Sequence, residues 1–223
     1  MILITGGLGF IGTHTTRALL DLGESCVLVQ RRAATAAALP GLISGAADGR
    51  VVVESVDVTD LAALLRIGER HEITGVLHLA GAPWPPGPDP IADARAGCEG
   101  LLNVLQAARD WRVARVGVAS TIGVYGGADA SEPLREDTLL PLTAGHAIPG
   151  AKKVAELLCD QLAEATGMEI YSVRIAGVWG PLGRPTSRFF GAPQLVHAAA
   201  NGTAPDFSQL YAPPPTTGST CAT

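Results

Sequence analysis

Three glycines at a spacing of three residues, Gly6, Gly9 and Gly12, follow an apolar run over residues 2–5 and come directly before a helical pattern. A chain that passes from a strand into a helix in this way bends sharply, and glycine lets the backbone lie close to a bound group. The helix N-terminus presents free N–H groups and a positive dipole, which suit the diphosphate of a dinucleotide. An ordinary tight turn is the alternative interpretation. The residues that we expect to contact a cofactor here are Gly6, Gly9, Phe10, Ile11 and Gly12.

The rest of the chain continues this alternation of strand and helix. Short apolar, β-branched runs predict strands over residues 2–5, 26–30, 51–56, 75–79, 113–119 and 170–174. Ala- and Leu-rich patterns predict helices over residues 11–22, 61–70, 91–111 and 150–166. Strands that are apolar on both faces and separated by helices indicate a parallel sheet covered on both sides. We therefore predict an α/β fold with a doubly wound parallel sheet of the Rossmann type.

Two segments interrupt the alternation. Residues 82–90 hold five prolines and are expected to form a loop. After Tyr211 the chain carries neither charge nor periodicity, so residues 212–223 are expected to be a disordered tail. We expect residues 1–181 to form the dinucleotide-binding domain and residues 182–211 to begin a truncated substrate-binding part.

Composition limits the classes of function. The formal net charge is -5 at pH 7 with no basic tract, which argues against nucleic acid as a partner and favours a small-molecule substrate. No stretch reaches the roughly 20 apolar residues of a membrane span, and residues 1–6 lack the basic start of a signal peptide. We therefore expect a soluble, cytoplasmic protein. The cysteines lie far apart without a CxxC pair, so neither a metal site nor a disulfide framework is expected.

The end of the second expected strand bears on the choice of cofactor. In this fold an Asp or Glu at that position accepts hydrogen bonds from the ribose 2′-hydroxyl of NAD. Here the chain has Gln30, Arg31 and Arg32 instead. Without the carboxylate nothing repels a 2′-phosphate, and an arginine fork suits one, so we expect NADP to be preferred, with NAD possible. The alternative is that the two arginines are solvated loop residues.

Six ordered motifs over residues 1–181 resemble the extended short-chain dehydrogenase/reductase family, in its NAD(P)-dependent epimerase/dehydratase branch. Besides the glycine turn, they are Asp57-Val58, His78-Leu79-Ala80-Gly81, Asn103, residues 120–126 ending in Val-Tyr-Gly, and residues 174–181 ending in Gly-Pro. The resemblance implies that Asp57 and Val58 contact the adenine and that Leu79, Ala80 and Gly81 lie beside the cofactor. Taken singly, Asp57 is equally well explained as a helix cap and Asn103 as a buried, satisfied amide.

The resemblance also implies the chemistry, which is hydride transfer between the nicotinamide and a carbon bearing oxygen, on a sugar nucleotide or a related small molecule. A Tyr acts as acid/base in the family, a Lys lowers its pKa and binds cofactor, and a Ser or Thr orients the substrate oxygen. By position Thr121 takes the hydroxyl role, with Ser120 as its neighbour, and Lys152 takes the Lys role, with Lys153 pointing away.

The family Tyr is absent from its position. The residue four before Lys152 is Ile148, and shifting the register to Lys153 places Pro149 there instead. An aliphatic side chain neither donates nor accepts a proton. Three explanations stay open: a catalytically silent NADP-binding or sensing protein, a replacement acid/base, or a reaction step that needs none. For a replacement, His146 with an ordinary pKa near ~6.5 is the first candidate and Tyr125 the second.

Assembly is suggested only by the resemblance. Family dimers often pair the two long helices beside the central strands, which are residues 91–111 and 150–166 here. A homodimer is therefore an expectation of the resemblance.

Overall fold

The computed structural model describes residues 1–31, 49–81, 87–129, 131, 133–208 and 210. It contains one sheet whose strands run in the order β3-β2-β1-β4-β5-β6, with every neighbouring pair parallel. The strands are β1 (Ile2–Thr5), β2 (Cys26–Gln30), β3 (Val51–Ser55), β4 (Gly75–His78), β5 (Arg115–Thr121) and β6 (Ile170–Ile175). The predicted doubly wound α/β fold is thus confirmed.

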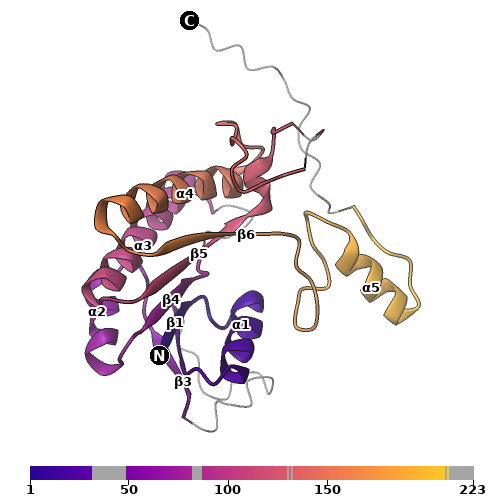
Figure 1. Cartoon of the computed structure of the whole chain (residues 1–223). Coiled ribbons are helices and arrows are strands. Elements are labelled where there is room, and N and C mark those ends of the chain that lie inside the picture. The colour runs from indigo at the N-terminus through magenta and orange to yellow at the C-terminus, as the bar shows by residue number, and fades with distance from the viewer. Residues whose placement is uncertain (32–48, 82–86, 130, 132, 209, 211–223) are drawn as a thin grey trace, which may run out of the picture.

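Helices cover the two faces of the sheet unequally. The helices are α1 (Phe10–Asp21), α2 (Leu61–Arg70), α3 (Pro90–Asp110), α4 (Ala147–Thr166) and α5 (Ala192–Asn201), and a 3-10 turn η3 (Ile122–Tyr125) follows β5. Figure 1 shows α2, α3 and α4 along one face and α1 on the other, with α5 beyond the end of β6.

Buried strand residues alternate between two apolar clusters. Leu3 of β1 packs in the larger cluster with Leu64 of α2 and Val104 of α3. The next residue, Ile4, packs in the smaller cluster with Leu20 of α1. Successive side chains of a strand point to opposite faces of the sheet. Where helices cover both faces, consecutive residues of the strand must therefore be apolar.

Helix α4 begins three residues earlier than predicted. Its N-cap is His146, so Ile148 and Pro149 lie in its first turn instead of in a loop. A proline is tolerated there because the first N–H groups of a helix have no partner within the helix. The position of the family Tyr is therefore helical.

Strand β5 is shifted toward the C-terminus relative to the prediction for residues 113–119. After α3 the backbone reverses through Arg112, whose φ is 57°, and the N–H of Val113 bonds to the carbonyl of Ala108. The strand then continues to Thr121, which pairs with Ile175 of β6. Thr121 therefore ends a strand instead of opening a loop.

Three predicted features lie partly or wholly outside the described residues. Of the expected loop at 82–90, residues 87–89 are described and precede α3, whereas 82–86 are not described. The expected tail at 212–223 lies outside the described residues, as does Arg32. Among the described helices, none is both long and apolar enough to cross a membrane.

Candidate functional site

The loops that leave β1 and β4 meet at the centre of the sheet. Because β1 connects outward to β2 on one side and pairs with β4 on the other, the strand order reverses between them. Open α/β sheets bind ligands in the crevice at such a switch point, at the carboxyl ends of the strands. The glycine turn follows β1 and the segment from Leu79 to Gly81 follows β4, so two of the predicted cofactor segments come together here.

The glycine turn depends on close backbone approaches. Gly6 has a φ of +70°, and a Cβ there would lie 3.1 Å from the backbone nitrogen of Ala80. A Cβ on Gly12 would lie only 2.4 Å from the carbonyl oxygen of Gly6. By contrast, a Cβ on Gly9 would meet only the Gly6 carbonyl, at 3.1 Å. Gly6 and Gly12 therefore let the turn close on itself, and Gly9 leaves its outer side open.

The N-terminus of α1 suits an anion. Its N-cap is Gly9, which has no side chain to accept from the first-turn N–H groups. The helices α2 and α3 instead begin with Asp60 and Asp89, whose carboxylates accept from their own first turns. The first turn of α1 also holds no acidic residue. A diphosphate therefore fits the residues present, because exposed N–H groups and the helix dipole favour negative charge at this point.

Gln30 faces the glycine turn. With its amide oxygen oriented toward the turn, it accepts hydrogen bonds from the N–H groups of Gly7 (2.9 Å) and Leu8 (2.6 Å). It therefore fastens the turn to the end of β2. Arg31 follows it in an exposed position.

The segment after β3 is held from α3. Asn103 donates from Nδ2 to the carbonyl oxygens of Val58 and Thr59, both at 3.0 Å. Asp57 accepts from the backbone N–H and the hydroxyl of Thr59, and the cap of α2 is Asp60, so the helix-cap interpretation of Asp57 is wrong. Asn103 is a satisfied amide that supports the segment predicted to contact adenine.

Lys152 and Lys153 point in different directions. The Nζ of Lys152 would lie 3.8 Å from a Cβ on Gly81, so it reaches the end of β4. Burial lowers the pKa of Lys152 below its ordinary value. Lys153 instead donates to the carbonyl oxygens of Pro141 and Thr143, in the loop that precedes α4. Of the two lysines, only Lys152 therefore reaches the end of β4.

Thr121 ends β5, and its Oγ1 accepts from the N–H of Gly123 at 3.2 Å. This contact caps the 3-10 turn, an element that the sequence did not reveal. An accepting oxygen keeps its own O–H, and in the described part of the chain no acceptor bonds to the Thr121 hydroxyl, so its proton is free for donation there.

The two candidate replacements for the missing Tyr have other contacts. Tyr125 is buried, and its hydroxyl donates to the carbonyl of Arg135 (2.8 Å) and accepts from Arg174 (2.6 Å). The ring of His146 stacks on Phe189 with centroids 5.2 Å apart, and burial lowers the pKa of His146. Tyr125 would have to give up its bond to Arg135 before it could donate a proton to a substrate.

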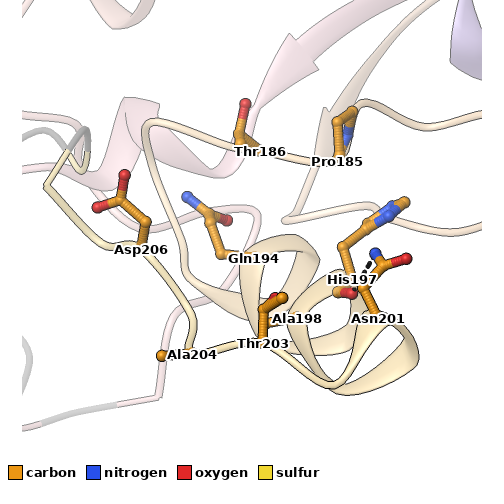
Figure 2. A pocket seen from close by; sticks show the side chains of 9 residues that line it. All are labelled: Pro185, Thr186, Gln194, His197, Ala198, Asn201, Thr203, Ala204 and Asp206. Carbon is orange, nitrogen blue, oxygen red and sulfur yellow. Dashed lines mark hydrogen bonds between the residues drawn. The ribbon is translucent and has the colours of Figure 1, made fainter.

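Two hollows lie near the C-terminal part of the described chain. One, of about 260 Å³, lies between the first residues of α1, Phe10 and Ile11 among them, and the loop after β6, and His14 bonds to the carbonyl of Pro181 beside it (2.8 Å). The other, of about 190 Å³, lies along α5 and is lined by the polar side chains of Gln194, His197 and Asn201 (Figure 2). Sequence reasoning missed the second hollow, because its residues belong to no motif. Within the described residues no cluster of His, Cys, Asp and Glu suits a metal ion.

A parallel sheet with a glycine turn at its switch point, followed by a helix whose N-cap has no side chain, defines a dinucleotide-binding Rossmann protein. The chain belongs to the NAD dependent epimerase/dehydratase family, whose model matches residues 2–207. Among curated relatives, a UDP-glucose 4-epimerase of Azospirillum brasilense is 30% identical over 207 residues, covering 89% of this chain and 55% of that protein. A UDP-glucuronate 4-epimerase of Thermodesulfobacterium geofontis is 34% identical over 139 residues, covering 60% of this chain and 42% of that protein.

Solved structures agree with this assignment. The UDP-glucose 4-epimerase of Thermus thermophilus in complex with NAD matches with a TM-score of 0.73 at 26% identity, over 91% of this chain and 63% of that one. A dTDP-glucose 4,6-dehydratase variant of Streptomyces venezuelae with NAD bound matches with a TM-score of 0.71 at 25% identity, over 91% and 62%. The chain thus spans less than two thirds of these proteins, and about half the length of the two curated relatives.

Proposed function

We propose that this chain binds a nicotinamide dinucleotide at the switch point and belongs to an enzyme that modifies a sugar nucleotide by hydride transfer. The observation that carries the proposal is the glycine turn at the switch point, whose close backbone approaches at Gly6 and Gly12 lead directly into the uncapped N-terminus of α1. Membership of the NAD dependent epimerase/dehydratase family supports it, and the relatives named above act on nucleotide sugars.

Each segment at the carboxyl edge of the sheet has a proposed role. The N–H groups of Phe10, Ile11 and Gly12 hold the diphosphate, and Asp57 and Val58 lie against the adenine. Leu79, Ala80 and Gly81 line the cofactor on the side of β4. The proximity of Lys152 to Gly81 supports a role for its ammonium group in holding the cofactor.

A nicotinamide dinucleotide held here would supply hydride transfer at a substrate carbon bearing oxygen, and the residues of this chain would position that carbon's oxygen. Thr121 donates a hydrogen bond to that oxygen and so orients it. Lys152 stabilises negative charge that develops there. The chain has Ile148 at the position of the family Tyr. The substrate proton therefore leaves by another route, or the reaction has no proton-transfer step.

NADP is the preferred cofactor in this proposal, and NAD remains possible. The end of β2 carries Gln30 and Arg31 without a carboxylate, which leaves a 2′-phosphate unopposed. The solved neighbours named above hold NAD, so they do not favour NADP. The division at residues 181/182 and the start of a substrate-binding part over 182–211 stay predictions.

A second candidate function rests on Ile148. A chain with an intact cofactor site and no acid would bind the dinucleotide without turning over substrate, as a catalytically silent or sensing protein. The two candidates share cofactor binding and differ in turnover.

Calorimetric titration with NADP and with NAD tests the shared part. We expect binding of both, with the lower Kd for NADP. If neither dinucleotide binds, both candidate functions fail.

A homodimer through α3 and α4 is also proposed. Both helices expose apolar side chains, namely Leu102, Val154 and Leu157. Sedimentation of Leu157→Glu against the parent chain tests it: we expect dissociation, and an unchanged mass would contradict this interface.

A further inference from the structure

A buried network of charged and polar groups joins α4 to β5 and β6. Glu156 of α4 is 6% exposed, and Arg174 of β6 donates to its carboxylate from Nε (3.1 and 3.2 Å) and from Nη2 (2.8 Å). The hydroxyl of Ser120 in β5 donates to the same carboxylate. The pairing of β5 with β6 sets Ser120 beside Arg174. One carboxylate therefore ties a helix to two strands.

Arg174 extends the network to the segments after β5. Its Nη1 donates to the hydroxyl of Tyr125 (2.6 Å) and to the carbonyl of Glu136 (3.0 Å). Its guanidinium also lies over the Tyr125 ring, 4.8 Å from the centroid. The 3-10 turn and the loop near residue 136 are thereby fastened to the same arginine.

This network lies next to both residues proposed for the reacting end. Ser120 directly precedes Thr121 in β5. Glu156 follows Lys152 by four residues on α4, so the two side chains share one face of the helix. A rotation of α4 about its axis would move the two side chains together.

Stability alone does not explain a buried ion pair. Desolvation of two charges often cancels their attraction, and apolar pairs of similar size are frequently as stable. What such a pair supplies is a defined geometry, because a bidentate arginine accepts the carboxylate in one orientation.

We propose that Glu156, held by Arg174 and Ser120, is a positioning residue that fixes the rotation of α4 and so directs the Lys152 ammonium group to Gly81. The inference rests on the proposed function in one respect, which is that the group bound near Gly81 is the dinucleotide cofactor. The direction in which Lys152 points is testable without it.

The experiment compares amine labelling of Lys152, followed by peptide mass spectrometry, in four proteins. They are the parent chain, Glu156→Gln, the apolar pair Glu156→Met with Arg174→Met, and Glu169→Gln. The last is the matched control, because Glu169 pairs with Arg115 on the surface (2.7 Å) and touches no residue of the network. Circular dichroism verifies that each variant folds. If Glu156→Gln does not fold, the apolar pair decides the result.

We expect saturating NAD to slow labelling of Lys152 by about tenfold in the parent and in Glu169→Gln, and to have little effect in the folded Glu156 variants. Their Kd for NAD should rise by about tenfold, because Lys152 no longer helps to hold the cofactor, and binding should still be measurable because the glycine turn holds the diphosphate. Equal protection in all folded proteins would overturn the proposal.

If the parent itself does not bind NAD, the proposed function fails and the positioning role is read from labelling without cofactor. The positioning role is then supported if Lys152 is labelled at rates that differ by at least about threefold between the Glu156 variants and Glu169→Gln. Equal rates would overturn it.

Discussion

Thr5 and His78 are joined across the centre of the sheet, with Oγ1 of Thr5 2.8 Å from Nδ1 of His78. The same Oγ1 accepts from the N–H of Ala80 at 3.1 Å. No other acceptor bonds to the Thr5 hydroxyl in the described part of the chain, so we assign its proton to the bond with Nδ1. His78 is thus neutral and carries its own proton on Nε2.

The burial of His78 makes stability depend on pH. Burial, and to a lesser extent the charge of Lys152, lowers the pKa of His78 to about 4 from its ordinary value of 6.5. Between these values the unfolded chain binds more protons than the folded one, so the contribution is complete above pH 6.5 and is lost as the pH falls toward 4. We expect the free energy of unfolding to fall by about 3 kcal/mol across this window, measured by urea denaturation.

The control variants isolate the contribution of His78. His78→Asn keeps an acceptor for the Thr5 hydroxyl but does not titrate, so it should flatten the pH dependence. His197→Gln changes an exposed histidine of α5 and should leave it unaltered. A pH dependence that survives in His78→Asn would contradict the assignment.

Gly12→Ala should damage both the turn and cofactor binding. The added methyl would lie 2.4 Å from the Gly6 carbonyl oxygen and 2.6 Å from the Gly7 Cα, and neither backbone atom can move without opening the turn. We expect a loss of about 1–3 kcal/mol in the free energy of unfolding and at least about a tenfold rise in Kd for NAD.

Gly97→Ala is the matched control for Gly12→Ala. Gly97 lies within α3, and a Cβ there meets nothing within 4 Å. Alanine should therefore stabilise the chain by about 0.5–1 kcal/mol and leave the Kd unchanged. Equal effects of the two substitutions would show that glycine is not required at the turn.

Gln30→Glu should reverse the cofactor preference. Glutamate keeps the length of the side chain, so it still reaches the N–H groups of Gly7 and Leu8, and it adds a carboxylate that accepts from a ribose 2′-hydroxyl and repels a 2′-phosphate. Calorimetry should register a change of about tenfold or more in the ratio of the two Kd values, toward NAD. As a control, Gln106→Glu adds the same charge at an exposed position of α3 and should leave the ratio of the two Kd values unchanged. If Gln30→Glu also left that ratio unchanged, the proposed ribose contact would be contradicted.

Ile148→Tyr tests whether the acid is the only missing part of the active site. Its position in the first turn of α4, four residues before Lys152, is where the resemblance places the family Tyr. With UDP-glucose as the probe and NADP or NAD as cofactor, we expect turnover to rise by about 10²–10⁴-fold. Ile148→Phe supplies the ring without the hydroxyl and should not change the rate. No gain with tyrosine would favour the silent protein.

The sequence predicted two central strands and one helix most accurately. The bounds of β1 and β2 agree with the prediction, because short apolar runs between turn signals correspond directly to buried parallel strands. The bounds of α2 agree as well, since its apolar residues recur at the helical period. Helix α4 begins at Ala147, before the predicted start at residue 150, and Pro149 lies in its first turn, where a helix accepts proline.

The network of Glu156 and Arg174 was beyond sequence reasoning. Its members are separated by 18 residues, and Ser120 and Glu156 by 36, so no local pattern links them. The place of Glu156 in this network follows from the register of β5 and β6, which sets Ser120 beside Arg174. The orientation of Gln30 was missed for the same reason, since it depends on the distance between β2 and the glycine turn.

The approach of Gly6 to Ala80 has a consequence for how the binding site forms during folding. The glycine turn is encoded in seven consecutive positions from Gly6 to Gly12, yet its backbone is in contact with residues that follow β4, more than seventy positions later. The turn therefore acquires its final shape only after β4 has docked beside β1, which requires closure of a long loop. Dinucleotide binding would accordingly appear late in refolding, after the central strands have paired, and a peptide limited to the first strand, turn and helix would lack half of the surface that shapes the site.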